Sequence, residues 1–134
     1  MKYFSKKVKM YGMTFDSKTE ASHYMKLKSR LDNGEIKNLQ LQVEFEIIPK
    51  LVVDELKVLK TKTKLVPKVL ERAAHYTADF VYEENGKIII EEVKSRGTML
   101  ARDYPLRRKL IRKKIAEMNN SLGVERYEFR EIVK

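Results

Sequence analysis

The segment YTADFVYEENGKIIIEEVKSR, residues 76–96, decides the fold because it predicts a β-hairpin. Two runs rich in Val, Ile, Phe and Tyr flank the dipeptide Asn85-Gly86. Asn-Gly is the strongest short-range signal for a type I′ turn, in which both central residues have a positive φ. Glu84 then pairs with Lys87 across the turn, and this pair fixes the register of both strands.

The predicted register brings two carboxylates together. Counting back from the turn places Asp79 opposite Glu92, and Lys94 lies two residues further along the same face. Directly opposed residues have Cβ atoms about 4.5–5.5 Å apart, where like charges repel, and a divalent metal is the usual cation between them. Glu91 points to the opposite face, so we interpret Glu92 as the functional carboxylate. The alternative is a cross-strand salt-bridge ladder in which both acids pair with Lys94 and nearby arginines.

Both faces of the predicted hairpin carry apolar residues, as expected for central strands that are covered on each side. Asp79 and Glu92 then lie at the rim of a buried face, where a charge is rarely kept without a partner. The face with the two acids carries Val81, Ile88 and Ile90, and the other face carries Phe80, Tyr82, Ile89 and Val93.

Three segments in a fixed order resemble a known nuclease family. They are FDSKTEASHYMKLK (15–28), YTADFVY (76–82) and EEVKS (91–95). Asp79, a hairpin and then Glu92-Val93-Lys94 resemble the core motif of PD-(D/E)xK nucleases. The three segments together are similar to those of small phage-encoded nucleases related to Holliday junction resolvases. The resemblance covers residues 10–115. It departs from the family where Ala78 replaces the expected Pro, and where the segment 49–72 is longer than expected.

This resemblance implies an α/β fold with a restriction-endonuclease-like core, in which helices flank a mixed central sheet in the order αβββαβ. It implies a single domain over residues 1–134, with a basic arm (1–15) and an inserted basic segment (about 50–70). The implied catalytic residues are Glu20, Asp79, Glu92 and Lys94. The implied ligands of Mg²⁺, with Mn²⁺ as a substitute, are the carboxylates of Asp79, Glu92 and Glu20 and the carbonyl of Val93.

Composition favours a polyanionic partner. The 134 residues include 29 Lys and Arg against 19 Asp and Glu, a net charge of +10. Neutralising phosphates releases condensed counterions, which favours nucleic acid over a merely basic surface. The chain has no cysteine, which excludes a thiol nucleophile, a Cys-type zinc site and a disulfide scaffold, and fits a reducing cytoplasm. No stretch reaches the length of a membrane span or a signal peptide, so no membrane partner is expected.

The N-terminal region divides into an arm and a helix. Residues 1–15 are basic with interspersed aromatic residues, and either follow a phosphate backbone or form a loosely packed terminus. Ser17 and Glu20 match a capping box, so a helix is expected from Ser17 to about Leu31. Asn33-Gly34 ends it.

Glu20 has two compatible interpretations. It is a capping residue, and it also continues a buried stripe on one side of the helix. In nucleases of the resembled kind the first helix offers a Glu to the metal centre. His23 lies off the stripe and is expected at the surface or on a phosphate. The stripe comprises Glu20, Tyr24, Leu27 and Leu31.

The middle of the chain predicts a connector, a strand and a ribbon. Residues 35–41 are expected to be helical or irregular, and 42–49 alternate as a half-buried strand with Val43, Phe45 and Ile47 inward. Gln40 and Gln42 either contact substrate or form hydrogen bonds at the start of the strand. Residues 51–68 favour an extended β-ribbon over a short helix at 52–60. Its lysines either grip DNA or form a solvated face.

The C-terminal part predicts a basic helix and a last strand. Pro105 suits a first helical turn, and Asn119-Asn120 and Gly123 end the helix. Residues 126–133 alternate as an edge strand. Arg96 lies in a loop suited to contact the scissile phosphate. The expected DNA-binding residues are Arg96, Arg107, Arg108, Arg112 and Lys113, and the expected apolar side of the helix is Leu106, Leu110, Ile111, Ile115 and Met118.

The sequence therefore predicts a metal-dependent DNA endonuclease. The resemblance implies branched DNA such as a four-way junction as substrate, a homodimer as the active form, and a phage- or prophage-encoded protein in the cytoplasm of a bacterial host. Two alternatives stay open: a restriction-type or nicking endonuclease on duplex DNA, and a non-catalytic DNA-binding recombination accessory protein.

Overall fold

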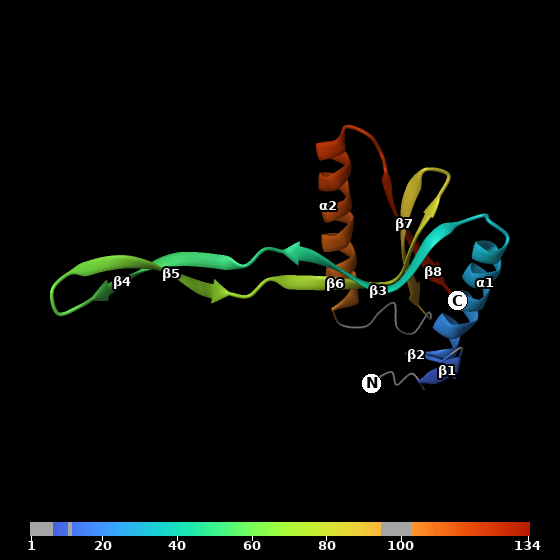
Figure 1. The fold of residues 1–134 in the computed structure, drawn as a ribbon, viewed down its shortest axis with the longest axis horizontal. Coiled ribbons are helices and arrows are strands. Elements are labelled where there is room, and N and C mark those ends of the chain that lie inside the picture. Colours follow the sequence, from blue (N-terminus) through green and yellow to red (C-terminus); the bar gives the residue numbers. More distant parts are fainter. Residues whose placement is uncertain (1–6, 11, 95–102) are drawn as a thin grey trace.

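The computed structural model describes residues 7–10, 12–94 and 103–134. Its described part is a mixed α/β fold with two helices (Figure 1). The elements in chain order are β1 (Val8–Met10), β2 (Met13–Phe15), α1 (Lys18–Asp32), β3 (Lys37–Ile48), β4 (Leu51–Val58), β5 (Thr63–Glu71), β6 (Ala74–Glu84), β7 (Lys87–Lys94), α2 (Tyr104–Leu122) and β8 (Tyr127–Val133).

The central sheet has the strand order β3-β6-β7-β8. β3, β6 and β7 pair antiparallel, whereas β8 lies parallel to β7 at the edge. The expected α/β class with a mixed sheet is confirmed. The expected edge strand at 126–133 is also confirmed as β8.

The two helices cover opposite faces of the sheet (Figure 1). α1 packs Leu27 against Phe80 and Ile89 in one hydrophobic cluster. α2 packs Ile111 and Ile115 against the other face in a second cluster. The predicted covering of both hairpin faces is confirmed, because the α1 cluster contains Phe80, Tyr82, Ile89 and Val93, and the α2 cluster contains Val81, Ile90 and, at its margin, Ile88.

The β6–β7 hairpin has the predicted turn and register. Asn85 and Gly86 have φ of 50° and 80°, and the backbone pairs run from Glu84–Lys87 to Phe80–Glu91. At the next step the carboxylate of Asp79 accepts a hydrogen bond of 2.8 Å from the backbone N–H of Val93. The side chain of Asp79 thus binds a backbone N–H of β7, next to the position where Asp79 and Glu92 were expected to face each other.

β3 begins earlier than expected. Residues 37–41 were predicted as a helical or irregular connector, and this was wrong, because Lys37, Gln40 and Leu41 already pair with β6. The alternation of apolar and polar residues already runs through Leu39, Leu41, Val43 and Phe45, and half-buried and exposed positions alternate with it. Gln42, in the middle of this run, has a φ of 52°.

Both β3 and β6 change face at the same level of the sheet. Leu41 packs in the α1 cluster and Val43 in the α2 cluster. On β6, Ala78 belongs to the α2 cluster and Phe80 to the α1 cluster. The pairs Leu41–Phe80 and Val43–Ala78 flank this point, which places Gln42 across from Asp79. The candidate carboxylate therefore lies where the sheet passes from one core to the other.

Residues 8–10 and 13–15 are more ordered than a loose arm. β1 and β2 form a hairpin, and Phe15 is buried in the α1 cluster. For residues 8–10 and 13–15 the loosely packed terminus was therefore the wrong alternative. α1 begins as predicted, since Ser17 Oγ accepts from the backbone N–H of Glu20 at 3.1 Å, and its C-cap is Asn33.

β4 and β5 form the predicted ribbon rather than a helix. They pair antiparallel and continue the direction of β3 and β6 away from the sheet (Figure 1). Every residue of β4 is exposed, and in β5 only Val66 is half-buried.

α2 has the expected ends, with Pro105 in its first turn and Gly123 in the left-handed conformation at its C-cap. Leu106 was expected on the buried side, but 60% of its surface is exposed. Tyr104 is buried in its place. No helix in the described parts of the chain is long and apolar enough to cross a membrane.

Candidate functional site

Asp79 and Glu92 lie on neighbouring strands in the middle of the sheet. Glu92 is 5% exposed. Its Oε2 accepts a hydrogen bond of 2.7 Å from the hydroxyl of Tyr76, and its Oε1 lies 3.2 Å from Nζ of Lys94. Asp79 accepts from the backbone N–H of Val93. Each carboxylate is therefore oriented by a neighbour with a fixed position in the sheet.

Lys94 is held at the end of β7. Besides its ion pair with Glu92, its Nζ lies 5.0 Å from the ring centroid of Tyr104, within the range of a cation–π contact. Its side chain is 28% exposed. The ammonium group thus stands at the solvent boundary of the carboxylates, where it can donate hydrogen bonds to an incoming molecule.

Glu20 approaches the two carboxylates from the first turn of α1. It is 4% exposed, and its Oε1 accepts a hydrogen bond of 2.9 Å from Nε2 of Gln42. The buried stripe predicted for α1 is confirmed, since Tyr24 and Leu27 are also buried and Leu31 packs against the same cluster. The residues of this site thus come from the first turn of α1, from β6 and β7, and from the point in β3 where the strand changes clusters.

The pKa values of the three acids reflect a shared negative field. Burial, followed by the charges of Asp16 and Glu92, raises the pKa of Glu20 to about 7. Burial, followed by the charges of Glu92 and Glu20, raises the pKa of Asp79 to about 8. Burial also raises the pKa of Glu92, against the opposing effects of Lys94 and Tyr76. The negative charges of these acids repel one another, and the single positive charge of Lys94 does not neutralise them. A cation between the acids is therefore favoured.

The acids do not form a ready-made ligand cage. Among the residues that the structure describes, no three His, Cys, Asp or Glu side chains are placed together so as to hold a metal ion. A hollow of about 510 Å³ at the C-terminal end of α2 is lined by Arg112, Asn119 and Glu125 among others, and it does not include the carboxylates. We base the site on the hydrogen bonds and charges, because a groove for an extended polymer does not need to be a deep cavity.

Glu131 and Tyr104 belong to the site but were missed from the sequence. Glu131 pairs with Glu92 in the parallel register of β8 and β7, and its charge raises the pKa of Glu92. The hydroxyl of Tyr104 and Nη1 of Arg108 both donate to Glu131, the latter at 3.4 Å. Neither a hairpin turn nor a short loop sets the register of a parallel pair, so the sequence carried no local signal for this contact.

His23 was expected at the surface or on a phosphate, and the surface placement was wrong. It is 8% exposed, and its Nε2 lies 2.6 Å from Oε1 of Glu91. Tyr82 donates its hydroxyl to the same carboxylate. Glu91 points away from Asp79 and Glu92, as predicted, and forms a second polar network under α1. The buried side of α1 is wider than the single stripe, so it includes His23.

The basic residues of α2 lie on several sides of the helix. Arg107 donates to the backbone carbonyl of His75 at 2.8 Å, on the β6 side. Arg108 and Arg112 face β8, where the Arg112 guanidinium lies 5.6 Å from the ring centroid of Phe129. The side chain of Lys113 is 74% exposed and pairs with Glu117 at 3.9 Å. Arg96 lies outside the described residues.

The fold and the site define a mixed α/β protein with an acidic centre beside Lys94 on its central hairpin. The chain belongs to the family described as "Protein of unknown function (DUF1064)", whose model matches residues 1–131. The match spans the helices, the sheet and the ribbon. No curated protein matches the chain. No solved structure matches it either.

Proposed function

We propose that this protein is a metal-dependent DNA endonuclease with a PD-(D/E)xK type of centre. The observation that supports it best is the placement of Asp79, Glu92 and Lys94 on one hairpin, with the buried Glu20 coupled to both acids. The order α1, β3, β6, β7, α2, β8 agrees with an αβββαβ restriction-endonuclease-like core. In this interpretation β4 and β5 are an insertion between the first two core strands.

The donor set fits Mg²⁺. This ion prefers hard oxygen ligands and keeps several of its waters, so two or three carboxylates suffice. Asp79, Glu92 and Glu20, with the carbonyl of Val93, would hold it, and Mn²⁺ would substitute. The raised pKa of each acid supports this fit, because a bound cation relieves the repulsion that raises it. When bound, the metal would neutralise developing phosphate charge and lower the pKa of water.

The residues of the chain supply orientation and proton handling. Lys94, fixed between Glu92 and the ring of Tyr104, would donate a hydrogen bond to the attacking water and stabilise its hydroxide form. The water would release a proton to the solvent as its oxygen bonds to phosphorus, the bond from phosphorus to the 3′-oxygen would break, and that oxygen would take up a proton from the solvent. Tyr76 would hold Glu92 in the orientation that this geometry needs.

The substrate is proposed from charge and resemblance. A net charge of +10 on 134 residues favours a polyanion, and the resemblance favours branched DNA cut by a homodimer in a bacterial host cell. Arg107, Arg108, Arg112 and Lys113 would contact phosphates, with Arg96 near the scissile one. A restriction-type or nicking activity on duplex DNA is the second candidate. A non-catalytic DNA-binding recombination accessory protein is the third, and the presence of all four residues Glu20, Asp79, Glu92 and Lys94 argues against it.

Cleavage of labelled synthetic DNA tests the proposal. A four-way junction, a linear duplex and a single strand are incubated with Mg²⁺ or Mn²⁺ and wild-type protein, Asp79→Asn or Asp32→Asn. Asp32 is the last residue of α1 and its side chain is 66% exposed, so its variant controls for the loss of one acidic charge. We expect symmetric nicks in the junction that disappear only with Asp79→Asn. Cutting of all substrates would support metal-dependent cleavage but contradict a preference for junctions. Tight DNA binding without cutting would instead favour the non-catalytic accessory protein.

A further inference from the structure

The β4–β5 ribbon has two chemically different faces. The cross-strand pairs Val52–Val69, Asp54–Pro67, Leu56–Leu65 and Val58–Thr63 point to one side, which we call the apolar face. The intervening pairs Val53–Lys68, Glu55–Val66 and Lys57–Lys64 point to the other side, which we call the lysine face. Six of the eight residues of the apolar face are hydrophobic or proline, and its one charged residue is Asp54.

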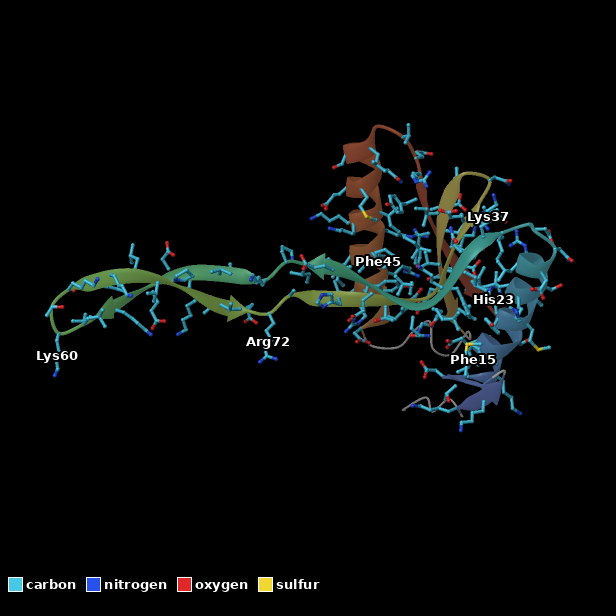
Figure 2. The ribbon with its side chains drawn as sticks, in the orientation of Figure 1. Phe15, His23, Lys37, Phe45, Lys60 and Arg72 are labelled. Atoms are coloured by element: carbon cyan, nitrogen blue, oxygen red, sulfur yellow. The ribbon has the colours of Figure 1, made fainter. Side chains whose placement is uncertain are left out.

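The apolar face is open to solvent along its length. Leu56, Val58 and Leu65 are 62%, 78% and 64% exposed. β4 and β5 pack chiefly against each other, and Figure 2 shows Lys60 at the far tip of the ribbon, well away from the body that contains His23 and Phe15. An isolated two-stranded hairpin is marginally stable in water. A ribbon of this length with an uncovered apolar face therefore needs a partner.

Nucleic acid does not suit the apolar face. Phosphates are bound by cationic groups and hydrogen-bond donors, and on this face the one side-chain donor is the hydroxyl of Thr63. The lysine face supplies Lys57, Lys64 and Lys68 instead, and Lys68 pairs with Glu55 at 3.6 Å. The lysine face therefore suits a polyanion, whereas the apolar face suits a partner whose surface is itself apolar.

We propose that the apolar face is a dimer interface, occupied by the same face of a second copy of this chain. A two-fold axis requires a self-complementary patch, and both strands of this face are apolar, so either alignment places apolar side chains together. With on the order of 80–100 Å² exposed by each of six apolar side chains, two copies would bury roughly 1,000 Å² in total, the lower limit for a specific interface.

The charges of the chain agree with this arrangement. Each copy carries a net charge of +10, so association is favoured only where the lysines stay apart. Sheets that pack face to face lie about 10 Å apart, so the two lysine faces would point outward, separated by more than the Debye length of about 8–10 Å at physiological salt. The lysines then remain available to a polyanion on both outer sides of the dimer. The interface does not depend on the nuclease activity proposed above.

Sedimentation velocity from about 1 to 100 µM tests the interface, with two matched double variants. Leu56→Thr with Leu65→Thr makes one cross-strand pair of the apolar face polar and keeps a residue that suits strands. Lys57→Thr with Lys64→Thr changes the adjacent pair on the lysine face. We expect a wild-type dimer, at least about tenfold weaker association of the leucine variant, and unchanged association of the lysine variant. A monomeric wild type, or equal effects of both variants, would overturn the proposal.

Introduced cysteines give a second readout that does not require destabilisation. The chain contains no cysteine, so every intermolecular cross-link must come from the introduced residue. Leu56→Cys and Leu65→Cys are expected to form covalent dimers with a short bismaleimide, whereas Lys57→Cys and Lys64→Cys are expected to stay monomeric on denaturing gels. Equal cross-linking from both faces would show random collision and would contradict a dimer formed through the apolar face.

Discussion

Gln42 Nε2 donates a hydrogen bond of 2.9 Å to Oε1 of Glu20, and Gln42 does so from a backbone with a φ of 52°. A positive φ costs on the order of 1–3 kcal/mol for a residue other than glycine, and such strain persists where the surroundings impose it. Gln42 also lies at the point where β3 passes from one hydrophobic cluster to the other. Gln42 thus links the point where β3 changes clusters to Glu20 of α1.

Gln42→Ala is expected to lower DNA cleavage by about tenfold. The bond from Gln42 favours the charged form of Glu20, whose pKa is about 7. Its loss raises that pKa further, so the loss of cleavage should be larger at pH 6.5 than at pH 8.5. Initial rates at both pH values measure this. Gln40→Ala, an exposed neighbour on the same strand, is the control, and an equal loss at both pH values would contradict the role given to Gln42.

The metal-free protein should lose stability as the pH rises from 5 to 8. The pKa of Asp79 is about 8 in the folded protein and 3.8 ordinarily, and that of Glu20 is about 7 rather than 4.5. Between these values the folded chain holds protons that the unfolded chain has released, so the free energy of unfolding falls with pH. The two shifts together correspond to a fall of several kcal/mol, which urea titration in a chelator measures.

Asp79→Asn should be more stable than wild type at pH 8 and should show a weaker dependence on pH. The amide keeps an acceptor for the Val93 N–H and removes a buried charge. Asp32→Asn, at the exposed end of α1, should follow the wild-type curve. If Asp79→Asn kept the full pH dependence, another group would be responsible.

Mg²⁺ should reverse part of the loss of stability at pH 8. A ligand at ten times its Kd stabilises the folded state by about 1.4 kcal/mol, which raises the Tm by about 4–6 °C for a domain of this size. The wild type should show this shift in differential scanning fluorimetry and Asp79→Asn should not. An equal shift in both proteins would place the metal elsewhere.

The features predicted correctly from sequence are those that local chemistry decides. The Asn85-Gly86 turn fixed the register of β6 and β7 because it permits two positive φ values, and Ser17 with Glu20 fixed the start of α1. The face-switch at Gln42 had no such signal, since glutamine is not a residue from which a left-handed conformation is expected. It was therefore missed. Residues 37–41 were assigned wrongly although Leu39 and Leu41 continue the alternation of Val43, Phe45 and Ile47.

The site was predicted in part for the same reason. The hairpin placed Asp79 and Glu92 near each other, and helical spacing placed Glu20 on the buried side of α1. Glu131 and Tyr104 come from the parallel strand β8 and from α2. Their positions depend on tertiary packing rather than on any short segment. His23 was misplaced because a single stripe underestimates how wide the buried side of a helix can be.

His23→Ala should destabilise the protein by about 2–3 kcal/mol, because it removes a hydrogen-bond partner of the buried Glu91. His75→Ala, the change of the one other histidine at an exposed position, should alter stability by no more than about 0.5 kcal/mol. Urea unfolding at pH 7.5 measures both. Cleavage well below the Tm should be retained in His23→Ala, since His23 faces the network under α1. A specific loss of cleavage in a folded His23→Ala protein would place this network in the catalytic centre.

Lys94→Met should separate catalysis from metal binding. Lys94 contacts Glu92 through one ammonium group and stands at the boundary with solvent. Its removal takes away the proposed donor to the attacking water and leaves the proposed carboxylate ligands in place. Single-turnover cleavage should fall by about 10²–10⁴-fold, while the Mg²⁺-induced rise in Tm persists. Lys87→Met is the matched control on the same strand, since that side chain is exposed and pairs with Glu128 at 3.9 Å. A Lys94→Met protein that cleaves at the wild-type rate would remove Lys94 from the mechanism, and one that no longer responds to Mg²⁺ would make it a support of the metal site instead.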